Sequence, residues 1–488
     1  MNTSLLTKGT PALALLGLLL SGCQPDVEAP GIDKGSADFS KYVAIGNSLT
    51  AGFGDGGLYR DGQLNSYPNI LAGQLRAAGG GDFTQPLFTE AQLNGSGYLR
   101  LTGFTATGSP LTASVTDRVA IRGGIPTRTG LQFIYTKDTS PINNLGVTGI
   151  RMSDIETAGF GNTALNGGTL VAPTPIFNSY FERITPDGSN QTYRQRVAAS
   201  TPTFFSFWLG NNDVLGFATA GAAASSLTPV ADFTRLASNI LDDLTANGAK
   251  GVVATIPDVT NIPFFTTVGP GFRATLPGAA TVFITTGPAF TGAPLARKSF
   301  APADIRNATG GRQLFTLTAS PYVALFGRPN NGKAWRDVYN QAKASLPPTV
   351  SLSVFLAASA IDTTKAFGAT TENPIPSTLV LDDAEQPLVL TATTAFNDAL
   401  KSKANAKGLA IFDANAFFAQ IAATGFAING TVNTAGFISG NLFSLDGVHP
   451  TPRGYAVIAN EMISVINAKY GSTLQSVNPN AYRAVIFP

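Results

Sequence analysis

The run PTFFSFWL at residues 202–209 is the feature that most restricts how this chain can fold. The run is continuous, rich in aromatic side chains and followed by Gly210, which is typical of a strand buried on both faces. Such strands occur in parallel sheets, where each crossover connection lays a helix on one face of the sheet. We therefore expect short apolar strands to alternate with amphipathic helices.

The rest of the chain shows this alternation, which predicts an α/β domain with a mostly parallel sheet. Apolar residues at helical spacing alternate with short apolar runs that stop at glycine. The expected strands, besides 202–209, are 41–45, 251–256 and 409–412. The expected helices are 66–78, 232–247, 395–406 and a final helix capped by Thr451 with Pro452 at its first position.

Three long stretches without clear periodicity interrupt the domain, near 80–140, 158–200 and 262–390. Loops of this length usually carry function or structure of their own. In the third stretch, 313–327 alternates like a strand and 333–345 has helical spacing, so we expect a subdomain there.

Aromatic rings gather at the start of the third stretch, directly after an expected sheet strand. One hypothesis is that this insertion overhangs the functional site as a lid or acyl pocket. The alternative is that the rings pack the core of the subdomain itself. The rings are those of Phe264, Phe265, Phe272, Phe283 and Phe290.

Composition excludes several classes of function. The chain has 488 residues, a net charge of +2 and only 13% charged residues, against about 25% in typical domains. Without a basic cluster there is no electrostatic footprint for nucleic-acid binding. The 44% hydrophobic content is ample for a buried core.

The N-terminus has the order of a secretory signal: Lys8, then the apolar run 11–20, then small residues. The sequence Leu-Ser-Gly-Cys that ends at Cys23 resembles the lipobox of bacterial lipoproteins, in which the cysteine is acylated. We expect a signal peptide at 1–22, a lipid-anchored flexible tether at 23–38 and one domain at 39–488, in the cell envelope. The expected membrane is the outer membrane, facing the periplasm or the outside. A plain signal peptide is the alternative.

The counts of cysteine and histidine exclude further chemistry. Cys23 is the only cysteine, so internal disulfides and cysteine-rich metal sites are excluded. His449 is the only histidine, which excludes a multi-histidine zinc site. We expect no metal and no cofactor.

Acyl transfer by serine needs a nucleophile, a base, a group that orients the base, and donors for the oxyanion. His449 is the one candidate base, and Asp446 lies three residues before it, close enough to orient its ring. Ser48, in the glycine-rich stretch AIGNSLTAGFGDGG after the first strand, is the candidate nucleophile. The side-chain amide of Asn212 is a candidate oxyanion donor, and in NLGVTG the backbone N–H of Gly146 or Gly149 could approach a substrate closely.

Together these segments resemble the SGNH hydrolases, the GDSL-type esterases and lipases. GNSL at 46–49, the glycine of NLGVTG at 144–149, GNND at 210–213 and DGVH at 446–449 match the four blocks of that family in order. The resemblance implies a three-layer α/β/α, flavodoxin-like fold with long insertions. It implies Ser48, His449 and Asp446 as catalytic triad, with an oxyanion hole formed by Ser48, Gly149 and Asn212.

One residue departs from the family pattern. Asn47 stands where the family usually has aspartate, and keeps its shape and one acceptor oxygen. The resemblance implies hydrolysis of carboxylic esters, of a lipid or an acylated glycan. A carbohydrate O-acetyl esterase and a non-catalytic lipoprotein that binds a glycan or a protein partner are the alternatives.

Two other motifs compete for the stretch that contains Ser48. Gly52, Gly54 and Gly57 have the spacing of a dinucleotide-binding loop, but no acidic residue follows about 20 positions on. The elbow G-x-S-x-G of α/β-hydrolases fails because its fifth position is Thr50. We therefore interpret these glycines as room for a substrate. A glycosidase with paired carboxylates has no supporting motif.

Overall fold

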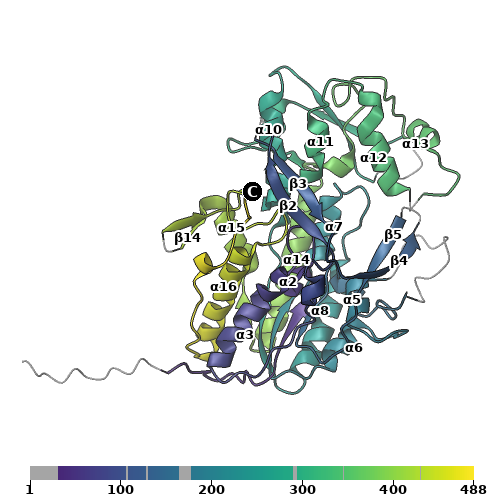
Figure 1. Cartoon of the computed structure of the whole chain (residues 1–488). Helices are drawn as coiled ribbons and strands as arrows, with labels where there is room; N and C mark the ends of the chain where they lie inside the picture. The colour runs from purple at the N-terminus through teal and green to yellow at the C-terminus, as the bar shows by residue number, and fades with distance from the viewer. Residues whose placement is uncertain are drawn as a thin grey trace, which may run out of the picture.

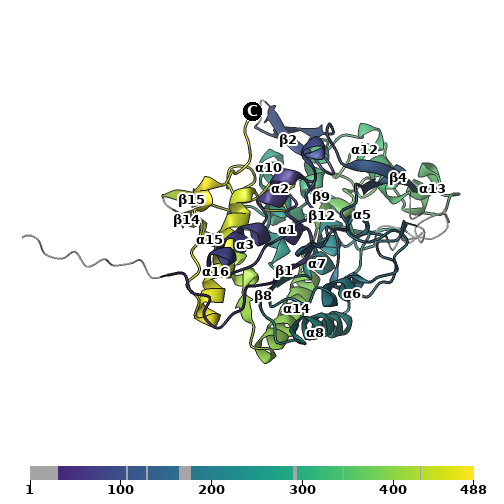
Figure 2. The same ribbon diagram turned by 60° about the horizontal axis from the view of Figure 1, so that its bottom comes forward.

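The central sheet of the computed structural model consists of five parallel strands in the order β13-β8-β7-β1-β6. Figure 2 labels two of them, β1 and β8. Four of them confirm the expected strands; the sequence does not predict β6, since three residues are too short to show periodicity. The strands are β1 (Tyr42–Gly46), β6 (Asn144–Gly146), β7 (Phe204–Trp208), β8 (Lys250–Ala254) and β13 (Ala410–Phe412).

The structure describes residues 31–105, 108–127, 130–163, 177–288, 294–343, 346–428 and 430–488. The expected signal peptide, Cys23 and Phe290 lie outside these ranges. None of the helices in these ranges combines the length and the apolar character needed to cross a lipid bilayer.

Helices cover both faces of the sheet because the side chains of each strand alternate between them. On β7, Phe204 and Trp208 belong to the core under α3 (Tyr67–Ala77) and α16 (Pro452–Tyr470). Phe205 and Phe207 belong to the core under α8 (Val230–Thr245) and α14 (Gln386–Ala406). The fold is therefore α/β, with a parallel sheet between helices.

The expected helices are confirmed, with one boundary corrected. Thr451 caps α16 by accepting a hydrogen bond from the N–H of Gly454 at 3.2 Å. The helix α14 begins at Gln386, whereas the expected helix begins at residue 395. Residues 386–394 are rich in threonine and other β-branched residues, which disfavour helix. Packing of Val389 in the core overrides that preference.

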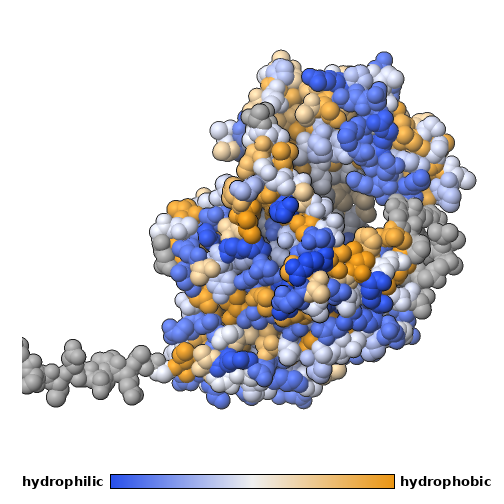
Figure 3. Space-filling model, viewed as in Figure 1, coloured by the Kyte–Doolittle hydropathy of each residue, from blue (hydrophilic) through white to orange (hydrophobic). Residues whose placement is uncertain are grey.

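The first two insertions carry short elements beside the sheet. The first forms the hairpin of β2 (Tyr98–Phe104) with β3 (Pro110–Val115) and that of β4 (Ile121–Thr127) with β5 (Gly130–Tyr135). The second contains α5 (Ser179–Arg183) and α6 (Tyr193–Ala198). The hairpins expose hydrophobic side chains (Figure 3), those of Phe104, Leu111, Leu131 and Phe133.

The third insertion forms a subdomain with its own hydrophobic core, seen at the top of Figure 1. The helix expected at 333–345 is confirmed, but the strand expected at 313–327 is wrong apart from two residues. Pro321 stands in the first turn of a helix there, a position that proline tolerates well. The elements are α9 (Pro263–Thr266), α10 (Val268–Thr275), β9 (Val282–Thr286), β10 (Ala296–Phe300), β11 (Leu314–Phe315), α11 (Ser320–Val323), α12 (Lys333–Ala342), α13 (Leu352–Ala358) and β12 (Val380–Leu381).

The remaining elements surround the carboxyl end of the sheet. They are α1 (Ser48–Ala51), α2 (Arg60–Leu64), α7 (Asn211–Thr219), α15 (Ala414–Thr424), β14 (Phe426–Ile428) and β15 (Thr431–Asn433).

Candidate active site

The candidate site lies where the carboxyl ends of β1 and β7 meet, the position at which open α/β sheets collect ligands. Ser48 is the first residue of α1, and only Asn47 separates it from the end of β1. The side-chain oxygen of Asn47 caps this short helix by accepting a hydrogen bond from the N–H of Leu49 at 3.0 Å. The turn therefore holds Ser48 at the edge of the sheet.

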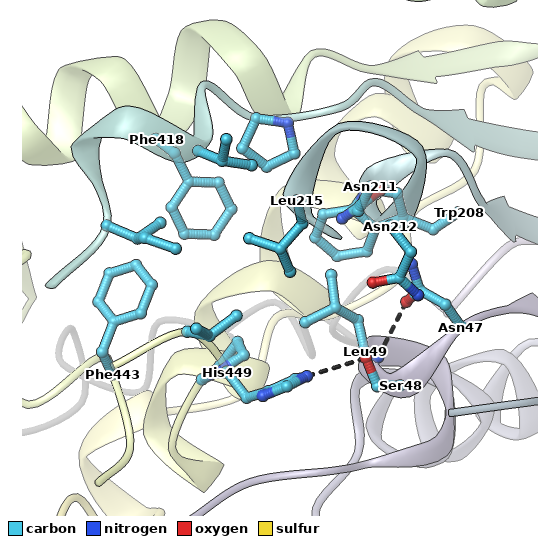
Figure 4. A pocket seen from close by; sticks show the side chains of 15 residues that line it. Asn47, Ser48, Leu49, Trp208, Asn211, Asn212, Leu215, Phe418, Phe443 and His449 are labelled. Atoms are coloured by element: carbon cyan, nitrogen blue, oxygen red, sulfur yellow. Dashed lines mark hydrogen bonds between the residues drawn. The ribbon is translucent and has the colours of Figure 1, made fainter. Parts of the chain in front are cut away.

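The structure brings Ser48, His449 and Asp446 together although Ser48 and His449 are 401 positions apart. Nε2 of His449 lies 2.8 Å from Oγ of Ser48, and Nδ1 of His449 lies 2.9 Å from Oδ2 of Asp446. Figure 4 shows the imidazole directed at the serine hydroxyl. This is the geometry of a serine whose proton a histidine can accept while a carboxylate orients the ring.

The carboxylate of Asp446 is held in its ionised form by its surroundings. Burial by itself would raise its pKa, but the attraction of His449 and hydrogen bonds from His449 and Val448 outweigh burial and lower the pKa to about 2. Its Oδ1 accepts the N–H groups of Val448 at 2.9 Å and His449 at 2.8 Å. The N–H of Gly56 donates to Oδ2 at 2.9 Å.

The three expected oxyanion donors lie at the ends of neighbouring strands. Ser48 occupies the first position of α1, where a backbone N–H has no acceptor within its own helix. Gly149 follows β6 with φ +81°, a conformation that favours glycine, and its N–H donates to no described residue. Asn212 uses its side-chain Nδ2 to donate to the carbonyl of Ile150 at 2.8 Å, which leaves its second N–H for a ligand.

Asp213 joins the segments that carry Gly149 and Asn212. Its buried carboxylate accepts the N–H of Met152 at 2.7 Å and the hydroxyl of Thr228 at 2.6 Å. Burial raises the pKa of Asp213 to about 6, against the effect of these hydrogen bonds. This carboxylate and the bond from Asn212 to Ile150 together hold α7 against the turn after β6, and so position the two donors relative to each other.

A cavity opens to solvent beside Ser48 (Figure 4), and its void together with the adjoining solvent-filled space measures about 550 Å³. Ser48, Asn212 and His449 line it, and Gly149 does not. Its other polar lining residues are Asn47 and Asn211, the neighbours of Ser48 and Asn212 in the chain. The remaining ten of its 15 lining residues are apolar, so the cavity has a reactive polar end and an apolar body.

The sequence did not reveal the contacts that hold the two loops of the candidate site together. Asp55 accepts the N–H of Leu445 at 3.0 Å and the hydroxyl of Tyr59 at 2.7 Å, while its own N–H donates to Oγ of Ser444 at 2.9 Å. Asp55 adopts φ +54°, in the left-handed region that aspartate tolerates better than most residues. Nothing in its sequence context signals this role, because the partners lie 390 positions away.

The interpretation of the neighbouring glycines as room for substrate is wrong for Gly52 and Gly57. A Cβ on Gly57 would lie 1.7 Å from the carbonyl oxygen of Gly97, and one on Gly52 would lie 2.5 Å from that of Gly62. These glycines let backbone segments approach one another closely. The ring of Phe53, between them in sequence, packs on His449 with centroids 4.6 Å apart.

The aromatic rings expected to form a lid, as far as they lie in the described ranges, do not line this cavity: those of Phe264, Phe265, Phe272 and Phe283. Phe265 belongs to the core under α8, and Phe272 to the core of the subdomain. Phe264 touches the catalytic loop through its backbone, since its N–H donates to the carbonyl of Gly447 at 2.9 Å. The cavity instead takes rings from Phe418 of α15 and from Phe443, which the sequence did not indicate.

The departure at Asn47 leaves one polar atom without a partner. Its Nδ2 is buried and makes no hydrogen bond within the described part of the chain. The acceptor role expected of its oxygen is confirmed by the bond to Leu49. Within the described ranges, no group of three or more His, Cys, Asp or Glu side chains could hold a metal ion.

Comparisons with known proteins identify no family for this chain. No protein-family model matches the chain, and no curated protein sequence matches it.

Proposed function

We propose that this protein is a serine-dependent carboxylic ester hydrolase of the SGNH type. The observation that carries the proposal is the hydrogen-bonded series from Ser48 through His449 to Asp446 at the polar end of an open cavity. The four sequence blocks and the position of the site on a parallel sheet with helices on both faces support the same family and its three-layer fold.

In the first half of the proposed reaction, Oγ of Ser48 attacks the ester carbonyl carbon while Nε2 of His449 takes the hydroxyl proton. Asp446 stabilises the imidazolium. The N–H groups of Ser48, Gly149 and Asn212 stabilise the oxyanion. The proton on Nε2 then passes to the departing alcohol oxygen, which leaves an acyl ester on Ser48.

In the second half, a water molecule gives a proton to Nε2 and its oxygen attacks the acyl carbon. Collapse of the second tetrahedral intermediate releases the carboxylic acid and returns the proton to Oγ. Asp446 stays ionised throughout, consistent with its low pKa. The cycle needs no cofactor.

The first test is covalent labelling of Ser48 by a fluorophosphonate probe, which reacts only with an activated serine. The intact protein should be labelled and should hydrolyse p-nitrophenyl butyrate, whereas Ser48→Ala and His449→Ala should do neither while remaining folded. Ser353→Ala, an exposed serine on α13, is the matched control and should behave as the intact protein.

A labelled Ser48→Ala variant, or an unlabelled intact protein with a native circular dichroism spectrum, would contradict the proposal. The second outcome would favour a lipoprotein that binds glycan or a partner without turnover.

For location, we propose a lipoprotein of the cell envelope, anchored in the outer membrane through acyl groups on Cys23. The signal sequence and lipobox at the N-terminus support this. Replacing Cys23 by serine should release the protein from the membrane fraction without changing hydrolysis, because the anchor lies outside the domain that carries the site.

A further inference from the structure

The apolar body of the cavity points to the kind of ester that this site takes, if the proposed hydrolase function holds. We propose that the cavity binds the acyl chain of the substrate, and that this chain is an unbranched hydrocarbon of several carbons rather than an acetyl group. The cavity is thus an acyl-binding pocket, which makes the protein an esterase for medium or longer aliphatic acyl groups.

The lining of the pocket provides the first argument. Among the described residues that line it there is no Asp, Glu, Lys or Arg, and every polar side chain on its wall belongs to a segment of the proposed site. The ring nitrogen of Trp208 is already bonded, to the carbonyl of Thr255 at 3.0 Å, so the indole offers the pocket no free donor. A sugar in this space would leave its hydroxyl groups unpaired, which is costly, whereas a hydrocarbon chain loses nothing.

Two aromatic rings line the end of the pocket that lies away from Ser48. Phe418 and Phe443 pack against one another with centroids 6.1 Å apart, at the side of the pocket away from Ser48 (Figure 4). Phe443 is buried, and Phe418 is partly buried. The methyl of an acetyl group would leave most of the cavity between Ser48 and these rings unfilled.

One helix face connects the oxyanion donor to the pocket wall. Asn212 and Leu215 are three residues apart on α7 and therefore share a face. Leu215 lines the pocket directly beyond the reacting end, with Val259 and Ile262 from the segment after β8. A carbonyl oxygen held by Asn212 thus has an apolar wall beside its acyl chain.

The order of events in ester hydrolysis assigns the pocket to the acyl chain and not to the alcohol. The alcohol must leave and water must take its place next to His449 before deacylation. A pocket with apolar walls admits water poorly, but it suits the acyl chain, which stays bound to Ser48 through both steps. The hydrocarbon then contributes binding energy in both transition states.

The test measures kcat/KM for p-nitrophenyl acetate, butyrate, hexanoate and octanoate with the full chain. Because each buried methylene contributes about fourfold, hexanoate, with four more methylenes, should exceed acetate by roughly 250-fold. A second series, acetate esters of ethanol, hexanol and octanol, should show little dependence on length. Dependence in the alcohol series alone would overturn the assignment to the acyl chain.

Two variants test the pocket itself. Leu215→Trp should fill it and lower kcat/KM for octanoate by about tenfold or more while acetate changes little, since a pocket of fixed size discriminates by methylene count. Phe418→Ala should open the far end and shift the preference toward longer chains. Leu388→Trp, an exposed leucine on α14 outside the pocket, is the control and should leave the profile unchanged.

The outcomes separate this inference from the proposed function. Labelling of Ser48 by fluorophosphonate together with a preference for acetate would overturn the acyl-pocket proposal and leave the hydrolase intact. Equal loss of all esters in Leu215→Trp with retained labelling would also overturn it. Absence of labelling would overturn the hydrolase and the acyl pocket together.

Discussion

Asp446 shows how single atoms determine the protonation state of the proposed catalytic group. Its two carboxylate oxygens accept five hydrogen bonds, from the N–H groups of Gly56, Val448 and His449, from the ring of His449 and from the hydroxyl of Ser444. These groups stabilise the ionised form, so burial does not protonate the carboxyl. The pKa of about 2 lies below the ordinary value of 3.8.

This lowered pKa predicts a loss of stability in acid. The folded state binds the proton of Asp446 less readily than the unfolded state, so its contribution is complete above pH 4 and disappears as the pH falls through 2. The contribution amounts to about 2 kcal/mol. In urea unfolding, the intact protein should therefore lose more free energy of unfolding between pH 5 and 2 than Asp446→Asn does. Parallel pH profiles for the two proteins would contradict this.

At the scale of elements, the site depends on two loops that come from opposite ends of the chain. The loop after α1 carries Asp55, and the loop before α16 carries Ser444, Leu445 and the Asp446–His449 segment. Two hydrogen bonds of Asp55 and one of Gly56 connect the two loops. A third hydrogen bond of Asp55, accepted from the hydroxyl of Tyr59, holds its carboxylate in position. The distance between Ser48 and His449 therefore depends on contacts outside the triad.

Asp55→Ala should lower both stability and turnover. The substitution leaves the N–H of Leu445 and the hydroxyl of Tyr59 buried without their acceptor, at a cost of about 2 kcal/mol or more in the free energy of unfolding. Turnover should fall because the loop that carries His449 loses its support, and fluorophosphonate labelling of Ser48 should slow. The measurements are urea unfolding and labelling rate.

Asp61→Ala is the matched control for Asp55→Ala. Asp61 also forms hydrogen-bonded ion contacts, with Arg483, but its side chain is 53% exposed. Exposed ion pairs contribute little, so this variant should change stability by less than about 1 kcal/mol. If both variants had equal small effects, Asp55 would not brace the loops.

At the scale of the whole molecule, the third insertion has a core separate from those of the sheet. Phe272 is buried in that core, with ring centroids 5.0 Å from Phe315 and 5.6 Å from Phe326. The insertion meets the candidate site through Ile262 and the backbone contact of Phe264 with Gly447. Phe272 thus packs in the subdomain's own core, as the second hypothesis drawn from the sequence expects, whereas Phe265 packs in the core under α8.

Phe272→Ala should therefore destabilise the subdomain without altering acyl-chain preference. Loss of a buried phenyl ring costs about 3–5 kcal/mol, which hydrogen exchange of the amides in α10 and β9 should report. The ratio of kcat/KM for hexanoate to that for acetate should equal the ratio of the intact protein. A changed ratio would show that the subdomain shapes the pocket after all.

The sequence alone predicted the parts of this protein that depend on local pattern. The buried strands and most helices were predictable because apolar periodicity and capping residues such as Thr451 act within a few residues of one another. The residues of the proposed triad could be predicted for a different reason. The chain has one histidine, so His449 was the only candidate for the base. The first residues of α14 were not predicted as helix, because their helix propensity is weak and packing in the core overrides it.

The tertiary structure decided everything that depends on residues far apart in sequence. It placed Phe418 and Phe443 at the end of the cavity, paired Asp55 with a loop 390 positions away, and packed the insertion rings into other cores. It also assigned Gly52 and Gly57 to close backbone contacts. The periodicity of apolar residues indicates which face of a helix or strand is buried, but not which distant element packs on that face. The shape of the pocket depends on which elements pack together, so only the tertiary structure could show it.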